Sequence, residues 1–275
     1  MNIVKKSPTV LVFDSGIGGL SIYNEIHNKI PHLHYIYAFD NEMFPYGDKS
    51  SEFLIKRVNQ IIDTIIKTYS IDLVVIACNT ASTICLPSLR SKFSFPIVGV
   101  VPAIKPASKV TKNKCIGLLA TKATIQRAYT SNLIQEFAPD CDVKLLGLSE
   151  LAHIAENKLQ GIAVDMQQLE TLLQPWLELS VIPDTIVLGC THYPFIEEEL
   201  KILFPHTTFI DSGNAIAARV TSLLNERFDL NNQEQSSSKD NIVLSTQCNQ
   251  HVEKLMKKLS EYNLDKYHCI SVLGG

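Results

Sequence analysis

The chain has 275 residues, of which 45% are hydrophobic and 19% are charged, and its formal net charge is −3 at pH 7. This length accommodates two modest domains or one large one, and the composition is ordinary for a globular protein. A slightly acidic chain without long lysine or arginine runs argues against nucleic acid as the main ligand. No apolar run approaches the roughly 20 residues of a membrane helix, so no membrane partner is expected.

The N-terminal residues lead directly into a short strand-like run at 9–13, which is too short for a signal-peptide core. The seven cysteines are scattered without close pairing. An odd number of cysteines without CxxC spacing favours free thiols in a reducing compartment. We therefore expect a cytoplasmic protein.

Short β-branched runs alternate with helical patterns along the chain. Many of the strand-like runs are apolar almost throughout, as expected for parallel strands covered on both faces. Amphipathic stripes between them, over 51–69, 164–179 and 252–259, predict core-facing helices. The alternation predicts an α/β fold with mainly parallel sheets. The predicted strands span 9–13, 33–39, 72–77, 96–101, 115–120, 142–147, 185–189, 207–210, 241–245 and 267–272.

The chain is expected to form two pseudo-symmetric α/β domains. Strand ends followed by turn residues, near residues 100 and 211, mark the boundaries better than the polar run at 229–240, which predicts an exposed loop. The first domain would comprise 1–100 plus 212–275, and the second 101–211. Because ligands of open α/β sheets bind beyond the carboxyl ends of the strands, we expect the active site in the cleft between the domains.

Two stretches, 74–80 and 186–192, echo each other: each runs from apolar residues through a small residue to cysteine and then to small polar residues. Their cysteines, Cys78 and Cys190, stand where a strand should end and a helix begin. The N–H groups and partial positive charge of a helix N-terminus favour thiolate over thiol. Either cysteine alone is more simply explained as a small buried thiol, whereas two in matching contexts favour function.

A glycine-rich turn, Asp-Ser-Gly-Ile-Gly-Gly at 14–19, is expected between the first strand and a helix. It matches neither GxGxxG nor a P-loop, so a nucleotide site is weakly supported. Its glycines let a ligand approach the backbone closely. Asp14 either supplies a carboxylate at this strand end or caps the following helix.

Cys190 and His192 lie only two residues apart, without a CxxC or HxxxH pattern, which is a poor zinc signature. A lone histidine is more often structural, but His192 is placed to tune or protonate the chemistry at Cys190. Because no arginine lies in these motifs, an anionic ligand would be held by helix N-termini and by polar side chains at strand ends. The candidates for this role are Asn79, Thr80, Thr121 and Thr191.

With these motifs in view, the chain resembles the glutamate racemase family of bacterial cell-wall enzymes. The resemblance is carried by the glycine-rich turn, by Pro-Tyr-Gly, by the two cysteine stretches and by Asp-Ser-Gly. The last 60 or so residues match the family less distinctively. The matching runs are 13–20, 45–47, 77–82, 99–103, 188–194 and 211–213.

The resemblance implies an isomerase that uses no pyridoxal phosphate, no other cofactor and no metal. Cys78 would act on D-glutamate and Cys190 on L-glutamate, with Asp14 assisting Cys78 and His192 assisting Cys190. Glu150 matches a further acidic position on the Cys190 side. The implied substrate contacts are Asp14, Ser15, Tyr46, Gly47, Asn79, Thr80, Thr121, Thr191 and His192.

The chemistry agrees with such a pair, because inverting a stereocentre by proton transfer requires one acid or base on each face of the α-carbon. By the same resemblance, glutamate is the substrate and D-glutamate is supplied for peptidoglycan. Some members need the activator UDP-N-acetylmuramoyl-L-alanine, and residues 33–48 resemble that branch. A monomer or a homodimer is expected.

Three rival functions stay open at this point. One is another amino-acid racemase, or a decarboxylase, of the same two-cysteine superfamily. A regulatory binding protein that keeps the cleft but not the catalysis is the second, and the full set of acid–base residues argues against it. The third is a thiol–disulfide oxidoreductase, against which the absence of CxxC counts.

Overall fold

The computed structural model describes residues 7–228, 230 and 240–272. Its contacts divide the chain into two compact units. The first unit comprises Met1–Val100 and Gly213–Gly275, and the second comprises Val101–Ser212. Ser212 was expected at the edge of the first domain, but it lies in the second unit, where its hydroxyl donates to the Val101 carbonyl oxygen at 2.5 Å.

The first unit is built on a parallel sheet that has six strands among the described residues. The neighbouring strands are in register as parallel pairs throughout. Successive side chains of a strand point to opposite faces, and both faces of the central strand are buried, which explains its continuous apolar run. The strand order is β10 (Lys266–Cys269), β9 (Ile242–Ser245), β2 (His34–Phe39), β1 (Thr9–Asp14), β3 (Leu73–Ile76) and β4 (Ile97–Gly99).

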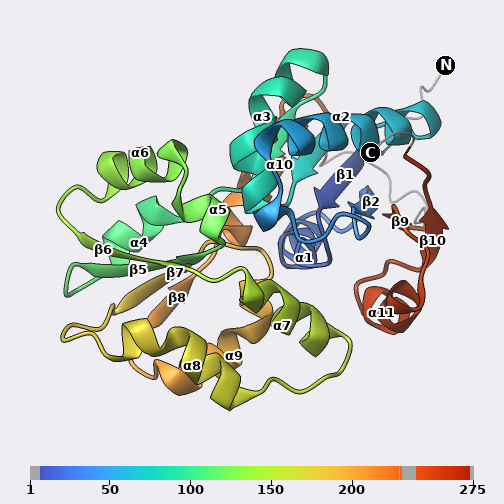
Figure 1. Ribbon diagram of the computed structural model, residues 1–275. Helices are drawn as coiled ribbons and strands as arrows, with labels where there is room; N and C mark the ends of the chain where they lie inside the picture. The colour runs from blue at the N-terminus through green and yellow to red at the C-terminus, as the bar shows by residue number, and fades with distance from the viewer. Residues whose placement is uncertain (1–6, 229, 231–239, 273–275) are drawn as a thin grey trace. The chain divides into compact units, whose positions relative to one another are not determined.

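Helices cover both faces of this sheet (Figure 1). On one face α2 (Ser51–Thr68) packs beside α3 (Asn79–Lys92), over Leu11 and Phe13 of β1. On the other, Tyr23 of α1 (Leu20–Lys29) meets the rings of Tyr35 and Tyr37 edge-on. The remaining elements of this unit are η1 (Tyr46–Asp48), α10 (Gly213–Asn225), which packs against α1, and α11 (Gln250–Glu261).

The second unit has a smaller parallel sheet, with four strands among the described residues. One face is covered by α4 (Ile104–Val110) and α6 (Ala128–Phe137), which pack with Ile116 and Leu118 of the sheet. The other face packs with α7 (Glu150–Leu159) and α8 (Met166–Leu177) around Trp176. The strand order is β6 (Asp142–Gly147), β5 (Cys115–Ala120), β7 (Thr185–Leu188) and β8 (Thr208–Ile210), and the other helices are α5 (Lys122–Ile125), η2 (Tyr193–Ile196) and α9 (Glu197–Leu203).

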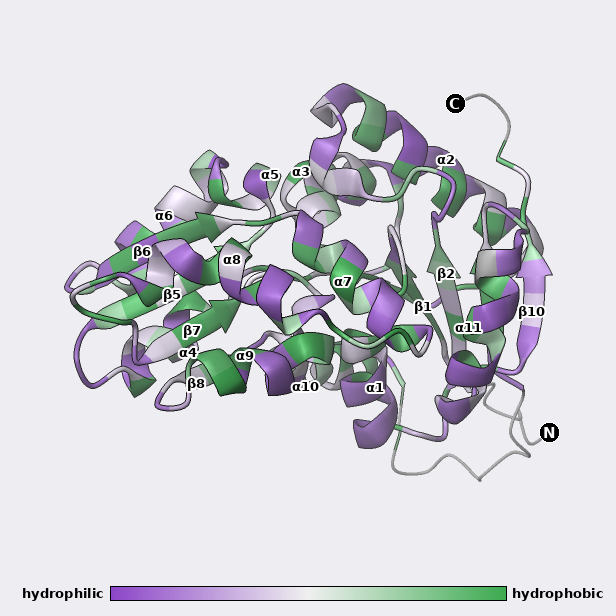
Figure 2. Ribbon diagram, turned by 60° about the horizontal axis from the view of Figure 1, so that its bottom comes forward, coloured by the Kyte–Doolittle hydropathy of each residue, from purple (hydrophilic) through white to green (hydrophobic). Residues whose placement is uncertain are grey.

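The predicted α/β fold with mainly parallel sheets is confirmed. Figure 2 shows the hydrophobic colour on the buried strands β1, β5 and β7, whereas the edge strand β10 is largely hydrophilic. Residues 229 and 231–239 of the predicted loop at 229–240 lie outside the described residues. Within the described part of the chain, no helix is both long and apolar enough to span a bilayer.

The prediction of free thiols is wrong for two of the seven cysteines. Cys248 and Cys269 form a disulfide, with their Cα atoms 5.9 Å apart. Cys248 follows β9 and Cys269 ends β10, and the parallel pairing of these two strands brings the residues together despite their separation in sequence. The cysteines outside this disulfide are Cys78, Cys85, Cys115, Cys141 and Cys190.

Candidate active site

In the first unit, three neighbouring strands deliver polar residues to the same edge of the sheet. The backbone pairing continues past the strand ends, because Ala77 N–H donates to the Phe13 carbonyl at 2.7 Å and Asp40 N–H donates to the Asp14 carbonyl at 3.0 Å. Asp14, Asp40 and Cys78 therefore lie at the carboxyl edge of β1, β2 and β3, where ligands of α/β sheets bind.

Asp14 is fully buried and holds the glycine-rich turn. Its Oδ1 accepts a hydrogen bond from Ser15 N–H and its Oδ2 accepts one from Gly19 N–H, both at 2.6 Å. A Cβ atom at Gly19 would lie 2.9 Å from the Cβ of Asp14 and 3.1 Å from that of Ala77, so the close approach of the turn to the sheet requires glycine there. Asp14 thus places a carboxylate at the strand end, whereas the predicted N-cap role is wrong, because the N-cap residue of α1 is Gly19.

Cys78 is the N-cap residue of α3, and its side chain is 6% exposed. Its Sγ lies 3.7 Å from the Ser15 hydroxyl, so the second residue of the glycine-rich turn reaches the sulfur. The helix N-terminus directly behind the sulfur is the environment that stabilises a thiolate. The predicted strand–cysteine–helix order is therefore present at Cys78.

The first turn of α3 adds two buried polar side chains, Asn79 and Thr80, which are 3% and 4% exposed. Within the described residues, the Asn79 Nδ2 atom has no hydrogen-bond partner. An unsatisfied buried donor costs free energy, which a bound acceptor would recover. Asn79, at the helix N-terminus beside Cys78, is thus a candidate to donate a hydrogen bond to a ligand.

Tyr46 and Gly47 lie on the short helix η1, beyond the end of β2. The Tyr46 side chain is 1% exposed, and its hydroxyl donates to Asp40 Oδ2 at 2.7 Å. Burial, followed by the neighbouring Asp40 carboxylate, raises the pKa of Tyr46 well above its usual value. Because the hydroxyl is already bonded to Asp40, the backbone of this turn is the part left to contact a substrate.

In the second unit, Cys190 follows β7 and is 7% exposed. Its Sγ lies 3.7 Å from Nδ1 of His192, which is itself 2% exposed. The Nε2 atom of His192 lies 3.0 Å from Oε1 of the buried Glu156. This chain of thiol, imidazole and carboxylate has the order of an acid–base group, its neighbouring base and an orienting group. The chain after Cys190 turns through the 3₁₀ helix η2 before α9 starts, so the expected α-helix does not begin at this cysteine.

Glu150 is the acidic residue that the resemblance assigns to the Cys190 side. It begins α7 with a side chain 50% exposed, and its Oε1 pairs with Lys122 Nζ at 3.4 Å. The carboxylate at His192 belongs instead to Glu156, on the same helix. Position 156 lies four residues after the buried Ala152 and so shares its face. An acidic residue on the apolar face of a helix was the sequence signal that identifies Glu156.

The remaining predicted residues of the second unit also lie at strand ends. Thr121 follows β5 and caps α5, where its Oγ accepts a hydrogen bond from Thr124 N–H at 3.2 Å. Thr191 lies between Cys190 and His192 and is 4% exposed. Since β5 and β7 are adjacent parallel strands, Thr121 and Cys190 share the same sheet edge.

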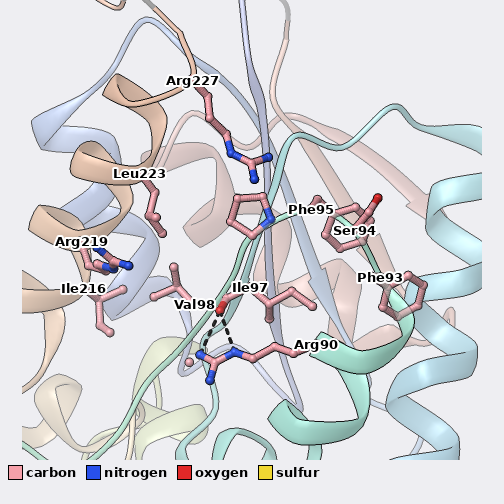
Figure 3. Close-up of a pocket in the computed structure, with 12 residues that line it drawn as sticks. Arg90, Phe93, Ser94, Phe95, Ile97, Val98, Ile216, Arg219, Leu223 and Arg227 are labelled. Carbon is pink, nitrogen blue, oxygen red and sulfur yellow. Dashed lines mark hydrogen bonds between the residues drawn. The ribbon is translucent and has the colours of Figure 1, made fainter.

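The first unit also contains a cavity of about 630 Å³ along the edge strand β4. Figure 3 shows Arg90 reaching in from α3 and Arg219 from α10, with Arg227 at one end. Arg90 Nε and Nη2 donate to the Ile97 carbonyl at 3.3 and 3.1 Å. Positive charge thus gathers here, at residues distinct from those around Cys78.

Comparison with known proteins identifies the family of the chain. The profile of the Asp/Glu/Hydantoin racemase family matches residues 11–220. Glutamate racemase of Pectobacterium atrosepticum is 58% identical over 218 residues, which cover 79% of this chain and 76% of that protein. Glutamate racemase of Escherichia coli O139:H28 is 48% identical over 268 residues, covering 97% and 93% respectively.

The fold matches as well. A crystal structure of Escherichia coli glutamate racemase in complex with L-glutamate and the activator UDP-MurNAc-Ala superposes with a TM-score of 0.91 at 47% sequence identity. The match covers 98% of this chain and 100% of that one. The chain therefore belongs to the Asp/Glu/Hydantoin racemase family and, within it, to the glutamate racemases, isomerases that act on an amino acid.

Proposed function

We propose that the chain interconverts L- and D-glutamate by proton transfer between two cysteines. The observation that carries this mechanism is the matched placement of Cys78 and Cys190, each buried at the carboxyl edge of a parallel sheet beside a polar partner. In the D-to-L direction the Cys78 thiolate takes the α-proton and the Cys190 thiol donates one to the opposite face. In the L-to-D direction the roles reverse, so each turnover leaves one thiol and one thiolate.

His192 is proposed to accept the proton of the Cys190 thiol and to return it. If Glu156 accepts a hydrogen bond from Nε2–H, the neutral imidazole presents an Nδ1 lone pair toward the sulfur 3.7 Å away. Nδ1 then accepts the thiol proton, and the resulting imidazolium is stabilised by the buried Glu156 carboxylate. At Cys78 the α3 N-terminus and Ser15 take this place, and Asp14 holds the turn that brings Ser15 there.

The substrate carboxylates are proposed to bind where N–H and hydroxyl donors converge. Asn79 Nδ2 and the α3 N-terminus would hold one carboxylate, since a helix N-terminus favours anions. The substrate ammonium would lie toward Asp14. The other proposed contacts are Ser15, Thr80, the backbone of Tyr46 and Gly47, Thr121, Thr191 and His192.

The reaction is proposed to supply D-glutamate for peptidoglycan synthesis in the cytoplasm. The test is incubation with each glutamate enantiomer in D₂O, with D-aspartate for comparison. Loss of optical activity with α-deuterium uptake is expected for glutamate only. Equal turnover of aspartate would reassign the substrate, and no exchange with either glutamate enantiomer, with and without the activator, would refute the enzymatic proposal.

We further propose that the cavity along β4 binds the activator UDP-N-acetylmuramoyl-L-alanine, the kind of ligand held by the Escherichia coli relative. A nucleotide diphosphate is anionic and carries a planar base. The cavity offers Arg90, Arg219 and Arg227, together with Phe93 and Phe95, whose stacked rings lie 5.2 Å apart. Arginine suits diphosphate recognition because its guanidinium makes charge-assisted hydrogen bonds to phosphate oxygens.

The activator proposal is tested by titrating UDP-N-acetylmuramoyl-L-alanine while racemisation and calorimetric binding are measured. Arg219→Ala should weaken binding about tenfold or more, because hydrogen bonds to charged groups are the strong ones. Lys254→Ala is the matched control, since it removes an exposed positive charge from α11 of the same unit. Equal binding by both variants would exclude this cavity as the activator site.

A further inference from the structure

A buried ion pair lies directly beyond β2. Asp40 is fully buried and Arg57 of α2 is 2% exposed. Arg57 Nε donates to Asp40 Oδ2 at 3.0 Å, and Arg57 Nη2 donates to Asp40 Oδ1 at 2.8 Å. Such forked pairs are directional, but desolvating both charges offsets much of the attraction, so burial of this pair is weak evidence of a purely stabilising role. The role of this ion pair is better explained by the neighbouring groups that it holds in position.

The same carboxylate binds two hydroxyl groups. Tyr46 OH donates to Asp40 Oδ2, and Thr246 Oγ donates to Oδ1, both at 2.7 Å. Four hydrogen bonds thus converge on Asp40 from α2, from η1 and from the segment after β9. We call Asp40, Arg57 and Thr246 the Asp40 network.

The loop between β2 and η1 is tied to this network along its length. Arg57 Nη2 also donates to Glu42 Oε2 at 2.5 Å, and Glu42 N–H donates to Thr246 Oγ at 3.2 Å. At its far end Tyr46 is fixed through its hydroxyl. The loop is therefore held near its start by Arg57 and Thr246 and at its end by Asp40.

Tyr46 in turn connects the network to the catalytic edge. Its ring lies 6.4 Å from that of Phe13, the last residue before Asp14, and it belongs to the same buried apolar cluster as Cys78. Burial keeps the phenol protonated, because it raises the pKa of Tyr46 together with the Asp40 charge, so its hydroxyl remains a donor to Asp40. A shift of the Tyr46 ring would carry the backbone of Tyr46 and Gly47 with it.

We propose that Asp40, Arg57 and Thr246 are positioning residues that fix Tyr46, and through it the backbone of the Tyr46–Gly47 turn, for glutamate binding. In this proposal the Tyr46 side chain anchors the turn, and the Tyr46 backbone contacts the substrate. This inference rests on the proposed placement of glutamate against that turn. It gives the segment that follows β9, which lies outside the family match at 11–220, a role in the site through Thr246.

The inference predicts a particular kinetic signature. Removing the hydroxyl of Thr246 or of Tyr46 loosens the Tyr46–Gly47 turn without changing the reacting groups, so KM should rise while kcat changes little. One lost hydrogen bond corresponds to an increase of about threefold to tenfold. Because the two enantiomers have equal free energies in water, kcat/KM must fall by the same factor in both directions.

The experiment compares two pairs of variants by steady-state kinetics in both directions and by thermal unfolding. Thr246→Val removes the hydroxyl that bonds Asp40, whereas Thr246→Ser keeps it. Tyr46→Phe removes the anchoring hydroxyl, and Tyr35→Phe is its control, because Tyr35 OH is a buried donor to the Ile30 carbonyl on the same strand β2.

Thr246→Val and Tyr46→Phe are expected to raise KM for both enantiomers, with Thr246→Ser restoring it and Tyr35→Phe lowering only Tm. A lower Tm with unchanged KM in both Thr246→Val and Tyr46→Phe would show that the network is merely structural and overturn the inference. Turnover of glutamate by the wild-type protein in the same assay tests the proposed function separately. Its absence would refute the proposed reaction and not the positioning role of the Asp40 network.

Discussion

At the residue scale, the two cysteines have different neighbours. Cys78 stands at a helix N-terminus, and its Sγ lies near the Ser15 hydroxyl. The Sγ of Cys190 lies near the His192 imidazole, which in turn contacts a buried carboxylate. Both cysteines could be found from the sequence, because each ends an apolar run and is followed by small polar residues. Glu156, the carboxylate behind His192, could not be found in this way, because a linear motif does not show which helical face a residue occupies.

Substituting each of the two glutamates of α7 in turn shows which of them assists His192. Glu156→Gln should lower kcat about tenfold or more, because the imidazole loses the carboxylate that orients it and stabilises its charged form. Glu150→Gln should change kcat less than about twofold, since Glu150 is half exposed and pairs with Lys122. Steady-state racemisation of the two variants measures the difference. A larger loss for Glu150→Gln would restore the assignment made from the sequence.

At the element scale, the parallel strands position the sites, and their apolar runs made them predictable. The glycine-rich turn was predicted as a close approach, and the structure gives the reason in the contacts around Gly19. The short η2 turn after Cys190 was not predictable, because Pro194 allows either a helix start or a turn. The Cys248–Cys269 disulfide also escaped prediction, since it depends on which strands are neighbours.

The turn after β1 gives a prediction at this scale. Gly19→Ala would push a Cβ atom to 2.9 Å from the Asp14 Cβ, so the turn must shift. Crowding of this kind typically costs about 1–3 kcal/mol. We expect a lower free energy of unfolding in urea and a reduced kcat, because Ser15 moves away from Cys78. Wild-type kcat in the folded variant would show that the position of the turn is unimportant for catalysis.

A second element-scale prediction concerns the start of β7. Asp184 accepts hydrogen bonds from Thr111 Oγ and from the N–H groups of Lys112 and Asn113, at 2.7 to 2.8 Å. Burial alone would raise the pKa of Asp184, but these hydrogen bonds outweigh it and leave the pKa lowered. The stabilisation is therefore present above the unfolded-state pKa of about 3.9 and is lost as pH falls through the lower folded-state pKa.

Asp184→Asn should accordingly reduce the free energy of unfolding at pH 7 by about 1–2 kcal/mol. The difference from wild type should shrink as the pH is lowered below about 3.9, where the aspartate itself becomes neutral. Urea unfolding at a series of pH values measures both quantities. A difference that stays constant down to the lowest pH would mean that the charge of Asp184 contributes nothing.

At the scale of the whole molecule, each of the two compact units contains one of the two cysteines that we propose to be catalytic, Cys78 and Cys190. The sequence predicted this division from the echo between the two cysteine stretches, which reflects the same strand-end position in two parallel sheets. The Asp40 network could not be anticipated in the same way. Its members, Asp40, Arg57 and Thr246, are far apart in sequence and meet only because β9 lies beside β2.

In the proposed mechanism Cys78 acts on D-glutamate and Cys190 acts on L-glutamate. The most direct measurement is α-proton exchange in D₂O by Cys78→Ala and Cys190→Ala, with each enantiomer supplied separately. Neither variant should racemise glutamate. Cys190→Ala should exchange the α-proton of D-glutamate only, and Cys78→Ala that of L-glutamate only, each with retention of configuration. Racemisation at the wild-type rate by either variant, or the reverse pattern of exchange, would contradict the account.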